Sequence, residues 1–135
     1  MTFEDLESWQ RARQLTREVY TLTRENELIK DFGLCSQIQR ASVSIMSNIA
    51  EGFERQHIAE KIQFYNVARG SSAEVRSLLY VIQDNYASLS ADAVRVKEKS
   101  VETGKLVTGL VKSTESRRSK IGVFLSSILH LLNPF

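Results

Sequence analysis

Proline and cysteine are almost absent from this chain of 135 residues. The one proline, Pro134, is the penultimate residue, and the one cysteine is Cys35. Because no internal proline interrupts the backbone hydrogen bonds of a helix, the chain favours long helices. A single cysteine excludes an intrachain disulfide and suits a reducing compartment.

Long apolar runs are also missing. The most apolar stretch, residues 121–132, is interrupted by Gly122, Ser126, Ser127 and His130. It is shorter than the ~20 residues that a membrane-spanning helix needs. The first residues are acidic and lack the basic-then-apolar order of a signal peptide. We therefore expect a cytoplasmic protein without a membrane span.

Charge of neither sign dominates, but the charges are unevenly distributed. Residues 90–135 carry 8 Lys and Arg against 4 Asp and Glu, a net charge of +4. Residues 1–89 carry 10 against 12, a net charge of −2. This asymmetry permits an acidic partner without requiring one.

Apolar residues recur at helical spacing, and strand signals are scarce. This pattern predicts an all-α protein, an antiparallel up-and-down four-helix bundle whose short connections make consecutive helices antiparallel. Residues 1–116 form this bundle, and residues 117–135 form a basic and then apolar tail with the spacing of a short additional helix. The four expected helices span about 3–24, 32–51, 59–88 and 91–113.

Particular residues indicate where these helices end and what they bury. Asp31 and Ser90 are predicted N-caps, and Gly52 is a predicted left-handed stop. The small residues at 70–73 are predicted to let another helix approach closely. The predicted inward stripe of the fourth helix is Val94, Val101, Thr108 and Val111.

A narrow polar ladder runs along the second helix between two apolar faces. Because apolar surface flanks the ladder on both sides, we expect its side chains to be buried and paired. One interpretation is an interface that fixes helix register and subunit pairing, and this is the interpretation we favour. The other is a ligand or nucleic-acid site. The ladder consists of Gln37, Arg40, Ser44, Asn48, Glu51 and Arg55.

The same stretch carries a family resemblance. Residues 37–52 read Gln-Ile-Gln-Arg-Ala-Ser-Val-Ser-Ile-Met-Ser-Asn-Ile-Ala-Glu-Gly. This run resembles the central motif of the four-helix-bundle proteins known as 23S ribosomal RNA intervening-sequence proteins. The resemblance covers about residues 3–112 and includes Phe3, Leu6, Trp9, Ala12, Phe32, Gly33, Leu34, Phe64, Ala68, Arg69, Gly70, Ser71, Ser72 and Glu74.

The resemblance implies a four-helix bundle, a ring-like homopentamer and no enzymatic activity. The accessory protein of diversity-generating retroelements is a distant relative, which implies association with nucleic acid. The chain departs from the family at Met46, where the motif often has proline, and after about Arg118, where the tail extends beyond the usual end.

Catalytic and metal-binding patterns are lacking. The run 54–57 spells the Glu-x-x-His half of a di-iron motif, but His130 has a serine in place of the second glutamate. Cys35 lies on an apolar arc and is predicted to be a small buried hydrophobe. We therefore predict a protein that is not an enzyme and that holds no metal and no cofactor.

Basic side chains follow three helices at turn spacing. Phosphate binding requires such charge to be brought together in space, and the alternative is an ordinary solvated surface. We predict association with RNA or DNA without sequence preference. The candidate residues are Arg13, Arg17, Tyr20, Arg24, Arg69, Arg76, Lys105, Lys112, Arg117 and Arg118.

The tail offers a different kind of partner. Its apolar residues have helical spacing, so we expect it to cover an apolar groove on its own or a neighbouring subunit. A structural adaptor that binds another protein is the alternative function, and a membrane-surface anchor is the alternative role of the tail. The apolar residues of the tail with this spacing are Ile121, Phe124, Leu125, Ile128, Leu131 and Leu132.

Overall fold

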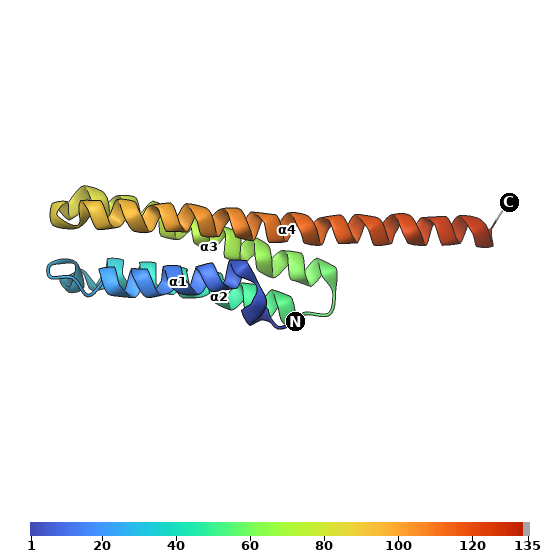
Figure 1. The fold of residues 1–135 in the computed structure, drawn as a ribbon, viewed down its shortest axis with the longest axis horizontal. Coiled ribbons are helices and arrows are strands. Elements are labelled where there is room, and N and C mark those ends of the chain that lie inside the picture. The colour runs from blue at the N-terminus through green and yellow to red at the C-terminus, as the bar shows by residue number, and fades with distance from the viewer. Residues whose placement is uncertain (134–135) are drawn as a thin grey trace.

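The protein is a bundle of four helices, one of which is much longer than the others (Figure 1). The computed structural model describes residues 1–133, and this part of the chain contains no strand. The predicted antiparallel up-and-down bundle is confirmed. Its helices are α1 (Glu7–Leu22), α2 (Phe32–Glu54), α3 (Ile58–Asn85) and α4 (Ser90–Leu132), with short 3₁₀ turns at Phe3–Asp5, Leu28–Lys30 and Ala87–Leu89.

Each helix packs against two neighbours around one apolar core. α1 contacts α2 and α4, and α3 contacts the same two helices, so α1 and α3 lie diagonally opposite each other. Side chains from all four helices fill the space between them. The largest fully buried ones include Leu15, Val19, Ile38, Ile45, Ile49, Tyr65, Val75, Leu79, Ile82, Val96 and Val107.

The start of α2 is fixed by the predicted cap. The Oδ1 atom of Asp31 accepts a hydrogen bond from the Leu34 N–H at 3.2 Å. Its Oδ2 atom accepts another from the Tyr86 hydroxyl at 2.8 Å. Asp31 therefore satisfies a free donor of the first helical turn and also ties the start of α2 to the end of α3.

The predicted stop at Gly52 is wrong. α2 continues through Gly52, which has no positive φ, and the backbone turns extended only at Arg55. Glycine is required here for space, because a Cβ atom would lie 2.6 Å from Cε1 of the buried Tyr65. Lys61 satisfies the helix end by donating to the Gly52 and Phe53 carbonyl oxygens at 3.3 and 2.6 Å.

The first helix begins later than expected. Residues 3–5 form a 3₁₀ turn, and the extended backbone of Leu6 separates that turn from α1. The Thr2 N–H donates to Asp5 Oδ2 at 2.8 Å, so the polar pair at the N-terminus caps this short turn and not the long helix.

The inward stripe of α4 also differs from the prediction. Val94, Val101 and Thr108 are only half-buried, and Leu89 takes the N-cap position predicted for Ser90 without a side-chain bond. Hydroxyl groups can occupy the core here because each bonds to a carbonyl oxygen of its own helix at 2.6–2.9 Å. The buried residues are Ala93, Val96, Ser100, Thr103, Val107, Val111 and Thr114.

The expected break before a fifth helix does not exist. α4 runs without interruption to Leu132 and leaves the bundle as a single projecting helix (Figure 1). Its apolar side chains cover no groove on their own chain, since only Ile128 is even half-buried. Among residues 1–133, no helix has the length and apolarity needed to cross a membrane.

Candidate functional site

The polar ladder of α2 lies along the surface groove between α2 and α3. Gln37, Arg40, Glu51 and Arg55 are exposed, and the shorter Ser44 and Asn48 are half-buried. The four long side chains are therefore not enclosed by the chain's own helices, contrary to the expectation that the ladder is buried. Burial between two copies of the chain stays a prediction.

The inner part of the ladder is nevertheless paired. The hydroxyl oxygens of Ser44 and Ser71 lie 2.8 Å apart, which joins α2 to α3. Asn48 Nδ2 donates to the Ser44 carbonyl oxygen at 2.8 Å and to its hydroxyl oxygen at 3.0 Å. Gln37 Nε2 donates to Glu74 Oε1 at 3.4 Å. The Ser44 and Gln37 contacts connect α2 to α3, whereas the Asn48 bonds lie within α2.

Two exposed residues of the ladder, Arg40 and Glu51, have charged side chains that are not paired in the described part of the chain. Within residues 1–133, neither Arg40 nor Glu51 has an ion-pair partner. The Arg55 guanidinium lies over the Phe64 ring, 4.6 Å from its centroid. Arg40 borders a groove of about 500 Å³ that is lined by Gly33, Ser36, Gln37, Ala41, Ser44, Ser71 and Glu74.

A second groove, between α3 and α4, gathers four of the predicted basic residues. Arg69 and Arg76 come from α3, and Lys105 and Lys112 come from α4. The groove has a volume of about 540 Å³, and none of its lining residues is Asp or Glu. In the described part of the chain, none of the four cations forms an ion pair. We call this surface the basic groove.

Small residues form the floor of the basic groove. A Cβ atom on Gly104 would lie 3.1 Å from the Ser72 hydroxyl oxygen. That hydroxyl donates to the Ser100 carbonyl oxygen at 3.2 Å. The close approach expected at the small residues 70–73 is thus confirmed at Ser72. Because Ala73 and Gly109 also line the surface, it stays hollow between the two rows of cations.

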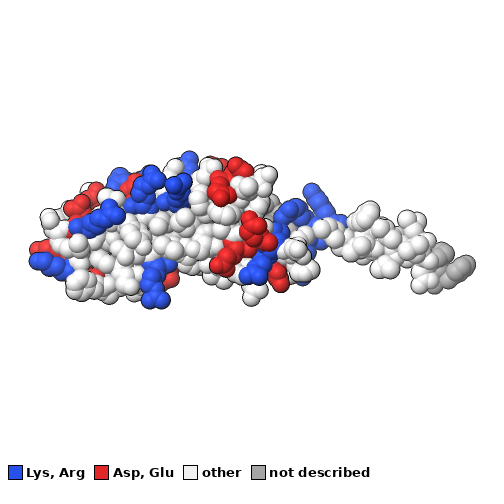
Figure 2. All heavy atoms as spheres, turned by 90° about the horizontal axis from the view of Figure 1, so that it is seen from below, with Lys and Arg blue, Asp and Glu red and all other residues white. Residues whose placement is uncertain are grey.

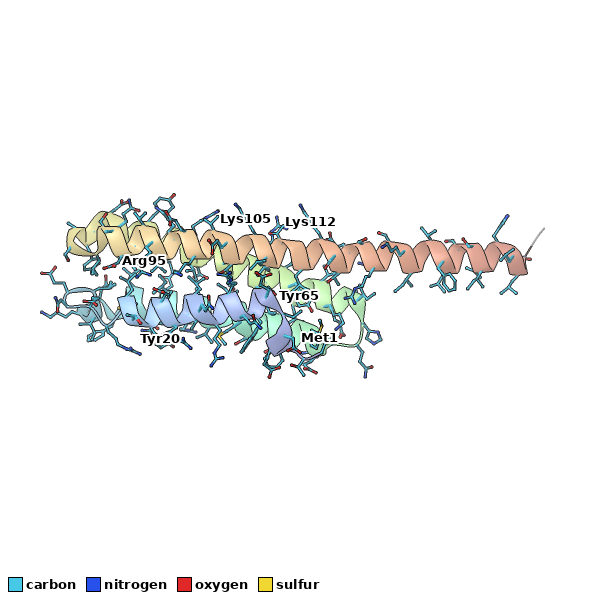
Figure 3. All side chains as sticks on the ribbon, in the orientation of Figure 1. Met1, Tyr20, Tyr65, Arg95, Lys105 and Lys112 are labelled. Carbon is cyan, nitrogen blue, oxygen red and sulfur yellow. The ribbon has the colours of Figure 1, made fainter. Side chains whose placement is uncertain are left out.

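The basic stripe of α1 lies elsewhere. Arg13, Arg17 and Tyr20 are exposed on α1, whereas Arg24 is exposed in the turn that follows the helix. Arg13 lies 5.8 Å from the Trp9 ring centroid. Figure 3 shows Lys105 and Lys112 projecting from α4 on the side away from α1 and Tyr20. The structure therefore separates this stripe from the basic groove and does not combine them into one surface.

Two further candidates, Arg117 and Arg118, lie where α4 leaves the bundle. Figure 2 shows Lys and Arg at this point, with Asp and Glu beside them on the bundle, and no charged side chain along the described tail beyond it. Burial lowers the pKa of Lys61, and the nearby positive charge of Arg117 lowers it further. The root of the tail is thus a third, separate cationic region.

Cys35 has the environment of a structural residue. It is buried, and its thiol donates to the Leu28 carbonyl oxygen, with the Sγ and oxygen atoms 3.0 Å apart. Burial raises the pKa of this thiol, which disfavours the reactive thiolate. Within residues 1–133, no cluster of three His, Cys, Asp or Glu side chains is placed to hold a metal ion.

A family comparison agrees with the motif on α2. The family model described as 23S rRNA-intervening sequence protein matches residues 4–109. The chain belongs to this family. A comparison with curated proteins finds no match. The match includes the whole polar ladder together with Arg69, Arg76 and Lys105.

The family match ends at residue 109, within α4. Lys112, Arg117, Arg118 and the apolar tail all follow residue 109, so they lie beyond the part of the chain that the family model matches. The match therefore covers most of the bundle, and the buried Val111 and Thr114 and the projecting part of α4 follow it.

Proposed function

We propose that this protein is a non-enzymatic, cytoplasmic homo-oligomer that binds RNA or DNA through the phosphate backbone without sequence preference. The basic groove carries this proposal. Arg69, Arg76, Lys105 and Lys112 border a hollow surface that no carboxylate lines, and none of the four forms an ion pair within residues 1–133.

The spacing of these cations suits an extended polyanion. On each helix the two cations are seven residues apart, which corresponds to about 10.5 Å along the helix axis. Two such rows face each other across the groove. Cations arranged in this way contact phosphates and release condensed counterions, which gives affinity but no base readout.

One groove with four cations supports only weak binding, so self-association belongs to the proposal. Copies joined in an oligomer present several grooves to one nucleic acid, and the linked contacts raise the apparent affinity. The exposed Arg40 and Glu51 of the ladder offer opposite charges for pairing between copies. We favour a homopentamer, because the family resemblance implies a ring.

The proposal is tested by titrating the protein against a fluorescent RNA hairpin and a DNA duplex over a range of salt concentrations. We expect binding at low salt that weakens steeply as salt is added, with similar affinity for unrelated sequences. Absence of binding at low salt to both probes would remove the proposal.

Charge reversal assigns the binding surface. Lys105→Glu should weaken binding to every sequence and reduce the slope of log affinity against log salt by about one. Lys30→Glu is the matched control, because Lys30 is exposed but lies outside the basic groove. The pair Arg13→Glu and Arg17→Glu tests the stripe on α1. If Lys30→Glu has the same effect as Lys105→Glu, the groove is not the site.

A further inference from the structure

The tail of α4 exposes large apolar side chains that have no partner on the chain. Phe124 is 64% exposed, Leu125 53%, Leu131 79% and Leu132 75%. Residues 121–133 contain no Asp, Glu, Lys or Arg. A contiguous apolar surface of this kind on a water-exposed helix indicates an interaction surface.

These side chains continue the seam that α4 buries inside the bundle. Ala93, Ser100, Val107 and Thr114 recur every seven residues and are buried. The same series continues as Ile121 and Ile128, and the series of Val96 and Thr103 continues as Leu110, Arg117, Phe124 and Leu131. The heptad of the bundle thus extends into the tail, where the chain has no helix to cover it.

We infer that the tail binds the tail of a second copy of this chain as an antiparallel helix pair. The contact surface, which we call the tail seam, consists of Ile121, Phe124, Leu125, Ile128, Leu131 and Leu132. This inference depends neither on nucleic-acid binding nor on the polar ladder.

A second copy fits the tail seam in both pattern and area. A heptad seam requires a helix with a matching seam, and the tail of another copy provides one by symmetry. Two copies contribute twelve large apolar side chains. At no more than roughly 100 Å² for each, they would bury up to about 1,200 Å², which is the lower limit of a standard specific interface.

A membrane surface fits the tail less well. Helices that lie on membranes carry Lys and Arg along their polar face. The face opposite the tail seam has Ser119, Gly122, Val123, Ser126 and His130 and no charged side chain. The cations are confined to the root of the tail, at Arg117, Arg118 and Lys120.

The positions of these cations favour the antiparallel arrangement. In a parallel pair, Arg117 and Arg118 of both copies would meet at one end of the seam and repel each other. Both bundles would also lie at that end, on the side that the second tail must occupy. In an antiparallel pair, the arginines approach the C-terminal end of the other helix, where unpaired carbonyl groups favour positive charge.

Antiparallel pairing also gives complete core layers. In an antiparallel pair, Ile121 and Ile128 of one copy face Leu131 and Phe124 of the other copy. Ile121 therefore contacts Leu131, and Phe124 contacts Ile128. By the twofold symmetry each contact occurs twice, which gives four apolar layers with no charged side chain among them.

The mass of the full chain in solution tests the pairing. We expect the double variant Leu125→Glu with Ile128→Glu to have at most half the mass of the unaltered protein by light scattering. Ser119→Glu with Ser126→Glu is the matched control on the opposite face and should keep the full mass. Because all four positions lie outside the bundle core, an unchanged midpoint for unfolding of the bundle shows that the fold is intact.

Equal masses for the three proteins would overturn the inference. If the double variant instead loses binding to phosphatidylserine vesicles at unchanged mass, the tail seam is a membrane surface and the inference also fails. The same masses also test the proposed ring separately. If the chain forms no ring but its tails still pair, the unaltered protein is a dimer and the double variant is a monomer.

Cysteine cross-linking tests the orientation. A mixture of the Ile121→Cys and Leu131→Cys proteins should form the mixed disulfide under mild oxidation, whereas each protein alone should form little. The native Cys35 does not compete, because it is buried. Efficient dimers of Leu131→Cys alone would show parallel pairing and overturn the antiparallel arrangement.

Discussion

The two halves of α4 share one heptad but differ in what faces them. In residues 93–114 the seam faces α1 and α3, and even Thr114 is 0% exposed. In the tail the seam faces no helix of the chain, and Leu131 is 79% exposed. Burial along this helix therefore follows the presence of a neighbouring helix and not the hydrophobicity of each side chain.

The largest expected effect on stability comes from a comparison of one valine in each half of α4. Val107→Asp places an unpaired carboxylate at a position that is 0% exposed. We expect it to lower the free energy of unfolding by about 3–5 kcal/mol, as measured by urea denaturation. Because small domains have only about 5–15 kcal/mol of stability, this variant should be close to unfolding.

Val123→Asp is the matched change in the tail. Val123 is 69% exposed and lies on the face opposite the tail seam. The free energy of unfolding should change by less than about 0.5 kcal/mol. If the two variants were equally destabilised, the tail would have to fold as part of the bundle core.

Two glycines give the next contrast. Gly52→Ala would place a Cβ atom 2.6 Å from Cε1 of Tyr65 and 3.0 Å from Cβ of Phe64. The repacking that this requires should cost about 1–3 kcal/mol of stability in a urea titration.

Gly122→Ala should act in the opposite direction. No atom lies within 4 Å of the added Cβ, and alanine favours the helical backbone over glycine by about 1 kcal/mol. We expect higher helical content by circular dichroism and no loss of stability. A loss of stability would indicate that Gly122 makes a close contact, as Gly52 does.

The smallest effect is a pH dependence at the end of the bundle opposite the tail. The hydrogen bond from the Tyr86 hydroxyl to Asp31, together with burial, raises the pKa of Tyr86 above its ordinary value of about 10. The protonated phenol therefore stabilises the fold fully below pH ~10, and this stabilisation is lost as the pH rises through the raised pKa.

Tyr86→Phe should remove this contribution. The variant should be less stable than the unaltered protein at neutral pH, and the difference should shrink above pH ~10. Unfolding midpoints measured from pH 7 to pH 11 check this expectation. A difference that stays constant over the whole range would assign the effect of Tyr86 to its packing alone.

The fold was largely predictable because its signals are local and periodic. The absence of internal proline, the Asp31 cap and the apolar residues at helical spacing predict the helices that the structure has. The errors arose where one residue type has two uses. Gly52 has the position of a helix stop but provides room for Tyr65. The predicted core residues Val94 and Val101 are only half-buried, while Ser100 and Thr103 are buried.

The candidate site was predictable only as separate stripes. Arg69 with Arg76 and Lys105 with Lys112 are visible as cations at helical spacing on two different segments. Nothing in their spacing shows that the two pairs border one groove or that the stripe of α1 faces elsewhere. Those relations depend on which helices are neighbours, and that is a property of the packed bundle.

The sequence by itself determined the helices, their antiparallel order and the family, because hydrogen bonding within a helix and apolar periodicity act over a few residues. The tertiary structure alone decided which small residues lie between α3 and α4, that the polar ladder is exposed on a single chain, and that α4 continues beyond its neighbours. The physical reason is that a side chain is buried only where a second surface covers it. The residues of one helix do not specify which surface that is.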